Sequence, residues 1–145
     1  MDKDVRHILE SKGNQIWSVS PDTSVYDALK LMAEKGIGAL LVMDGGKITG
    51  IMSERDYARK ITLLGKSSKD TPVKEIMSPE VVYVLPSQSA EMCMALMTEK
   101  RIRHLPVMDN DKLLGIVSIG DVVKALIDQK EDTINELTNY ITGRR

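Results

Sequence analysis

An internal repeat constrains this sequence more than any other feature. Residues 21–56 align without a gap with residues 86–121, and 16 of the 36 positions are identical, where chance would give only a few. A unit of this length is about half the usual size of a domain and would expose one face of its sheet. We therefore expect two copies that pack on each other as one module.

The repeat predicts the organisation of the chain. We expect a first repeat over residues 1–66 and a second over residues 67–145, joined by a polar linker at residues 65–72. Val5 and Ile8 match Val73 and Ile76 at an offset of 68, so the first copy has three extra residues before its first strand.

Hydrophobic periodicity predicts the same order of elements in both copies. In the first, we expect a strand at 16–19, a helix at 24–36, a strand at 38–43, a turn at 44–46, a strand at 47–52 and a helix from Ser53. A short helix within residues 1–14 ends at Gly13. The fold class is therefore α/β (α+β): two β-α-β-β-α repeats in one pseudo-two-fold module, with an extended C-terminal helix.

One heptapeptide recurs at the junction of strand and helix. Gly50 to Asp56 reads Gly-Ile-Met-Ser-Glu-Arg-Asp, and Gly115 to Asp121 reads Gly-Ile-Val-Ser-Ile-Gly-Asp. A serine and an acid three residues apart can form a capping box at a helix start. A helix N-terminus also suits a phosphate, and a carboxylate beside it can accept both hydroxyls of a ribose. Capping and ligand binding can share these residues, so both interpretations stay open.

Composition limits the classes of partner. The 20 basic and 21 acidic residues give a net charge of −1, which argues against nucleic acid or an anionic membrane as partners. No apolar run is long enough to span a bilayer, and the N-terminus lacks the pattern of a signal peptide. The single cysteine, Cys93, excludes an internal disulfide framework and suits a reducing cytoplasm. We therefore expect a cytoplasmic protein.

The C-terminal helix has no full counterpart in the first copy. We expect it over about residues 120–142, ended by Gly143. Its apolar positions step by threes and fours, with Lys130 as the one polar member; they are Val123, Ile127, Ile134, Leu137 and Ile141. Such a seam either folds back on the module or packs on another chain, and we favour a homodimer.

The ordered set of motifs resembles a tandem pair of CBS (cystathionine-β-synthase) domains. The resemblance is carried by the two heptapeptides, by the Pro-Asp-Thr-Ser stretch at 21–24 and by Ile-Arg-His-Leu-Pro-Val-Met-Asp at 102–109, and it extends from about Val5 to Ile127. It implies a compact disc with a cleft on each side between the repeats. It also implies a stand-alone regulatory protein whose ligand is an adenine nucleotide of the AMP, ADP, ATP or NAD class.

The resemblance also implies a set of nucleotide-binding residues. Asp56 and Asp121 would hold ribose hydroxyls, with Ser53 and Ser118 nearer the phosphates. Adenine would lie among the backbone and aliphatic side chains around Ser18, Val19, Ala39, Leu40, Tyr83, Val84, Leu105 and Pro106. Arg103 stands where many members keep a basic residue for phosphate, and His104 would lie beside it at the cleft rim. The first copy has Gly38 at that position, and Arg55 could compensate across the cleft.

Two other functions remain open at this stage. No nucleophile and base stand at a spacing that indicates catalysis, so we do not expect an enzyme. The two histidines, His7 and His104, lack ligand partners at metal-binding spacing, so no metal is predicted. The alternatives are a structural dimerisation module with degenerate clefts and a metal-assisted nucleotide-processing enzyme that uses Asp56 and Asp121. The sequence names neither the ligand within its class nor the regulated partner.

Overall fold

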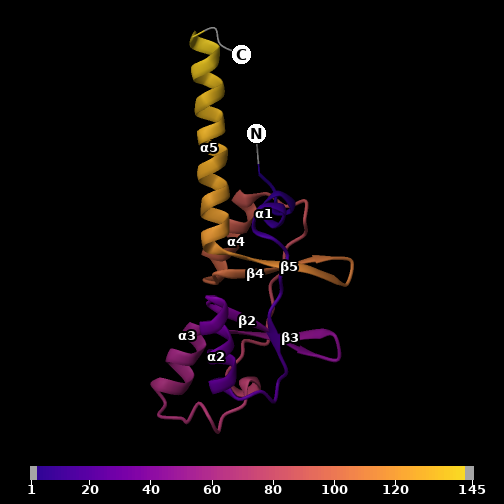
Figure 1. Ribbon diagram of the computed structural model, residues 1–145, viewed down its shortest axis with the longest axis vertical. Helices are drawn as coiled ribbons and strands as arrows, with labels where there is room; N and C mark the ends of the chain where they lie inside the picture. The colour runs from indigo at the N-terminus through magenta and orange to yellow at the C-terminus, as the bar shows by residue number, and fades with distance from the viewer. Residues whose placement is uncertain (1–2, 143–145) are drawn as a thin grey trace. The chain divides into compact units, whose positions relative to one another are not determined.

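The chain forms two compact units that interleave along the sequence. The computed structural model describes residues 3–142, with side chains to residue 139. One unit contains the chain up to Ile16 and again from Val82, and the other is Trp17–Val81. The elements, of which Figure 1 labels the α-helices and the strands β2 to β5, are α1 (Val5–Lys12), β1 (Ser18–Val19), α2 (Val25–Lys35), β2 (Ala39–Asp44), β3 (Lys47–Ser53), α3 (Glu54–Tyr57), η1 (Ala58–Thr62), η2 (Val73–Glu75), α4 (Ala90–Lys100), β4 (His104–Asp109), β5 (Lys112–Ser118) and α5 (Ile119–Thr142).

The unit Trp17–Val81 contains the sheet and the helix α2 of the first repeat. Its sheet has the order β1-β2-β3, with β1 parallel to β2 and β2 antiparallel to β3. The helix α2 begins after Ser24, whose side chain accepts the Asp27 N–H, and it ends at Gly36 in the left-handed conformation. The predicted helix from Ser53 is a single α-helical turn, α3, followed by the π-helical turn η1.

The second repeat lies in the other unit and departs from the prediction in one element. Its hairpin β4-β5 repeats the first in register and carries a β-bulge at the equivalent place, between Val107 and Met108. The prediction of a full first strand in this repeat is wrong. In its place the structure has a single parallel bridge between Val84 and Val107. The helix α4 ends at Arg101, which takes the left-handed conformation that Gly36 takes in the first copy.

Each unit includes the leading segment that precedes the other repeat in the sequence. The helix α1 lies with the second repeat, where Val5 and Ile8 join its core. The equivalent η2 lies with the first repeat, where Val73 and Ile76 join that core. The predicted boundary at residues 66 and 67 divides the repeated sequence, whereas the compact units divide the chain at Ile16 and Val82.

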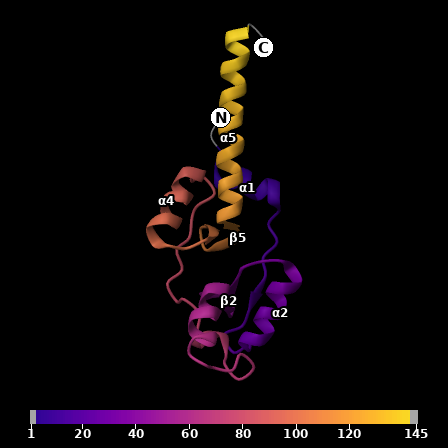
Figure 2. The ribbon, with the colours of Figure 1, turned by 90° about the vertical axis from the view of Figure 1, so that its left-hand side faces the viewer.

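The C-terminal helix α5 spans 24 residues and starts at Ile119, as the sequence predicted to within one residue. Its first turns pack on the second repeat's core through Val122 and Ala125, and Figure 2 shows α4 beside these turns. The predicted end at Gly143 lies outside the described residues, as does the side chain of Ile141.

Candidate functional site

The first Ser–x–x–Asp motif forms the predicted capping box at the start of α3. The Ser53 hydroxyl accepts the Asp56 N–H at 3.2 Å, and Asp56 Oδ2 accepts the Ser53 N–H at 2.9 Å. The ammonium of Lys60 lies 3.7 Å from Asp56 Oδ1 and also donates to the carbonyl of Ile76 at 3.0 Å. The carboxylate is therefore held at a helix start with a lysine beside it.

The second motif repeats this geometry at the start of α5. The Ser118 hydroxyl accepts the Asp121 N–H at 3.2 Å, and Asp121 Oδ2 accepts the Ser118 N–H at 2.8 Å. The lysine here comes from α1, because Lys12 Nζ donates to Asp121 Oδ2 at 2.6 Å and to the carbonyl of Ile116 at 2.9 Å. Both motifs thus place a lysine beside the acid, and the two lysines come from unrelated positions in the sequence.

These bonds set the charge of Asp121. Burial by itself would raise the pKa of Asp121, but the hydrogen bonds from Lys12 and Ser118 and the charge of Lys12 outweigh it, so the pKa is lowered. The side chain keeps 22% of its surface exposed. Asp121 is therefore an ionised carboxylate that a ligand can reach.

Strand pairing brings the other predicted residues close to each motif. Ala39 pairs with Ser53 in the first hairpin, and His104 pairs with Ser118 in the second. The first residue of each following helix donates its N–H to the residue before the hairpin, Glu54 to Gly38 at 3.1 Å and Ile119 to Arg103 at 2.8 Å. The side chain of Arg103 is exposed, next to the helix start that carries Asp121.

The same charged groups affect the pKa of His104. Burial is the largest cause that lowers the pKa of His104, the charges of Lys12 and Arg103 lower it further, and Asp121 opposes them. The imidazole is therefore neutral at pH 7, so it can offer one hydrogen-bond donor and one acceptor.

The residues expected around adenine differ in what they can offer a ligand. Leu40, Val84 and Leu105 are fully buried in the two cores. Their side chains serve packing, so a base would meet their backbone or their neighbours. Tyr83, in contrast, is 56% exposed. The remaining members of the predicted set are Ser18 and Val19 in β1, Pro106 in β4, and Arg55 in α3.

The unit with the second repeat contains a pocket that the sequence did not indicate. Its volume is about 230 Å³, and it lies between α1 and α5 with Asp121 in its wall. The other polar groups in the wall are Lys3, His7, Ser11, Lys12, Lys124 and Asp128. Lys12 could not be found from the sequence, because 109 residues separate it from Asp121.

Among the described residues, no three His, Cys, Asp or Glu side chains are grouped to hold a metal ion. Within residues 3–142, no helix has the length and apolar character needed to cross a membrane.

The fold and the site define a tandem module of two duplicated strand-helix units, each with a Ser–x–x–Asp motif at a helix start. The CBS domain profile matches residues 3–63 and again residues 73–128. The chain belongs to the CBS-domain family, as the resemblance predicted.

Individual relatives agree with this assignment. The chain is 40% identical to the mitochondrial CBS domain-containing protein CBSX3 of Arabidopsis thaliana, over 96% of this chain and 72% of that protein. It is 59% identical to a CBS-domain protein from Burkholderia ambifaria MC40-6, whose solved structure matches with a TM-score of 0.85 over 87% of this chain and 95% of that one. A more distant structure, the CBS domain pair of protein MJ0100 in complex with 5′-methylthioadenosine and S-adenosyl-L-methionine, is 23% identical with a TM-score of 0.76, over 89% of this chain and 99% of that one. At this identity the likeness shows the fold alone.

Proposed function

We propose that this chain is a regulatory module that binds an adenosine ligand and reports it by a change in shape or association. The ligand belongs to the AMP, ADP, ATP or NAD class, and the module performs no catalysis on it. The observation that carries the proposal is the carboxylate fixed at a helix start in both copies, by Ser53 for Asp56 and by Ser118 for Asp121.

The carboxylate geometry suits a ribose. The Ser118 N–H and the Lys12 ammonium both donate to Oδ2 of Asp121, so we assign Oδ1 to a ligand hydroxyl. A hydrogen bond to an ionised carboxylate contributes roughly 1.5–3 kcal/mol, which is enough to anchor a nucleoside. The lowered pKa of Asp121 supports this role, because it keeps the acceptor charged at neutral pH.

The phosphate of the ligand would be bound by groups around the helix start. We assign this role to Ser118 and to the guanidinium of Arg103, which can form a bidentate contact. In the first copy we assign it to Ser53 and Arg55. The structure of MJ0100, which has this fold, contains 5′-methylthioadenosine, and this supports an adenosine ligand. The roles assigned to residues here come from this chain alone, because the two sequences are only 23% identical.

We further propose that the module is a homodimer in the cytoplasm. Cys93 is buried, and burial raises the pKa of its thiol to about 11, so the only cysteine is an unreactive core residue that suits a reducing compartment.

A ligand panel in a thermal-unfolding experiment tests the function. A molecule that binds only the folded state stabilises it by about 2.7 kcal/mol at a hundredfold excess over Kd, which raises the melting temperature. AMP, ATP or NAD should produce this shift and UMP should not. Equal shifts with AMP and UMP would contradict base recognition. No shift with any of them would favour a structural dimerisation module, and turnover of ATP or NAD would favour an enzyme.

A further inference from the structure

The helix α5 carries a second apolar face that its own unit does not cover. We call this face the outer seam; its described members are Val123, Ile127, Lys130, Ile134 and Leu137. The exposed fractions of the four apolar members are 39, 52, 52 and 59% along the chain. The seam is thus a row of aliphatic side chains in solvent.

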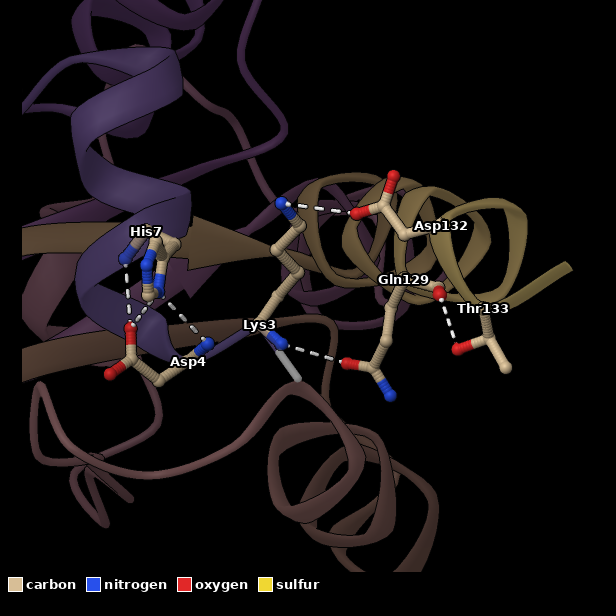
Figure 3. A network of polar contacts seen from close by, with 6 residues as sticks. All are labelled: Lys3, Asp4, His7, Gln129, Asp132 and Thr133. Carbon is tan, nitrogen blue, oxygen red and sulfur yellow. Dashed lines mark hydrogen bonds and ion pairs between the residues drawn. The ribbon is translucent and has the colours of Figure 1, made fainter. Parts of the chain in front are cut away.

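The inner face of α5 is tied to its unit by contacts with Lys3 near the middle of the helix. Lys3 donates its N–H to Gln129 Oε1 at 2.8 Å, and its ammonium lies 3.6 Å from Asp132. Figure 3 shows these contacts, together with the bond from the Thr133 hydroxyl to the Gln129 carbonyl at 3.1 Å. Figure 1 shows the later turns of α5 running clear of α1 and α4.

The later turns are poor helix formers by composition. Residues 131–139 include two threonines, two asparagines and one β-branched isoleucine, all of which have low helix propensity. Isolated helices shorter than about 12–15 residues are marginal in water, and most helices in proteins are stabilised by packing of an apolar face. A partner on the outer seam would supply that packing.

The spacing of the seam suits another helix as its partner. Its members step by four, three, four and three residues, which is the repeat of a coiled coil. In heptad notation, Ile127 and Ile134 are at a, and Val123, Lys130 and Leu137 are at d. The part of the seam formed by Ile134 at a and Leu137 at d has the combination that favours two parallel strands.

In a parallel pair of α5 helices, the polar seam residue Lys130 also has a partner of opposite charge. A d residue packs beside the e residue of the facing helix, so Lys130 would lie next to the partner copy's e position. That position is Glu131, which supplies an opposite charge, and two-fold symmetry forms the contact twice.

We propose that the outer seam of α5 forms a parallel, in-register two-stranded coiled coil with a second copy of this chain. The contact of Lys130 with Glu131 of the partner subunit favours this register, since a shift by one heptad would place the lysine opposite an apolar d residue. The inference rests on the proposed homodimer and names its surface; it is separate from the proposed nucleotide site.

Sedimentation of the full chain with one matched pair of variants tests the surface. The parent should sediment at twice the 16.1 kDa chain mass, and Ile134→Asp should sediment as a monomer over at least a tenfold range of concentration around the parent's dimer dissociation constant. Asn135→Asp adds the same charge one residue along, outside the seam, and should stay dimeric. A dimeric Ile134→Asp would overturn the seam while leaving a homodimer through another surface.

Cross-linking tests the parallel register. Leu137→Cys places a thiol where the two copies of residue 137 meet, and mild oxidation should give a disulfide-linked dimer. Glu136→Cys points away from the seam and should give little, and the parent controls for the buried Cys93. Equal linking of both variants, or none, would overturn the parallel pairing. A monomeric parent would overturn both the seam and the proposed homodimer. An AMP thermal shift on every variant tests the nucleotide proposal separately.

Discussion

The ammonium of Lys12 lies 2.6 Å from Oδ2 of Asp121, joining the end of α1 to the start of α5. Because Asp121 is the acid we propose for the ribose, a ligand there must share this carboxylate with Lys12 or displace it. The same lysine also donates to Ile116 in β5, so its displacement would loosen the end of α1. Lys12 therefore offers a way for ligand binding to change the structure of this unit.

Replacing Lys12 should strengthen the binding of adenosine. Lys12→Gln removes the ammonium that offsets the charge of Asp121 and so makes Oδ1 a stronger acceptor; partly exposed ion pairs of this kind contribute about 0–1 kcal/mol, so we expect up to about a fivefold gain in affinity. Calorimetry with adenosine measures it, because adenosine has no phosphate for Lys12 to contact. The control is Lys124→Gln, which removes a charge from the same pocket without touching this ion pair. An equal gain in affinity in both variants would attribute the effect to the overall positive charge of the pocket and not to the ion pair of Lys12 with Asp121.

The two hairpin glycines should differ in their tolerance of alanine. A Cβ at Gly50 would lie 2.9 Å from the backbone carbonyl oxygen of Ser78 and 2.7 Å from the sulfur of Met77, whereas at Gly115 it would meet a terminal methyl of Leu9 at 2.8 Å. Backbone cannot move aside cheaply, so Gly50→Ala should cost about 1–3 kcal/mol of unfolding free energy. Gly115→Ala should cost less, because the Leu9 side chain can rotate. Urea unfolding of both variants decides it, and a larger loss for Gly115→Ala would contradict this view.

Stability should fall when the pH is lowered below about 6.5. The pKa of His104 is lowered in the folded chain from its ordinary value of 6.5, so below that pH the unfolded chain binds a proton that the folded chain does not. The contribution of His104 is thus unchanged above pH 6.5 and decreases as the pH falls below it. His104→Gln should flatten the dependence of the unfolding free energy on pH just below pH 6.5. An unchanged slope would show that His104 protonates alike in both states.

The local patterns of this sequence predicted its elements well. The capping residues Ser24 and Ser53 and the terminating Gly36 stand where the structure has helix ends, because these signals act within a few residues. The capping boxes of both heptapeptides were confirmed for the same reason.

Contacts distant in sequence were not predictable. The match of Val5 with Val73 showed that the leading segments are equivalent, but not that each joins the unit of the other repeat. The ion pair of Lys12 with Asp121 and the pocket around it depend on that exchange. The short bridge at Val84 replaced an expected strand, since a pattern of alternating residues does not determine how many of them pair.

The two acids should contribute unequally, with the second repeat dominant. Arg103 stands beside the Asp121 motif, and its equivalent in the first copy is Gly38. Asp121→Asn should weaken AMP binding about ten- to a hundredfold, since a charge-assisted bond of roughly 1.5–3 kcal/mol is lost. Asp56→Asn should cost less, and Arg103→Ala should weaken AMP more than adenosine. The fold should survive in the Asn variants, because an amide oxygen can still accept the serine N–H. A larger effect of Asp56→Asn would reverse the assignment.

The direct test of ribose recognition is a calorimetric cycle that combines the protein and the ligand. AMP and 2′-deoxy-AMP are titrated into the parent chain and into Asp121→Asn. The parent should prefer AMP by about tenfold or more, since the 2′-hydroxyl donates to an ionised carboxylate, and Asp121→Asn should lose most of this preference. An equal preference for AMP in both proteins would contradict a ribose contact at Asp121, and no binding of AMP by the parent would contradict the proposed function itself.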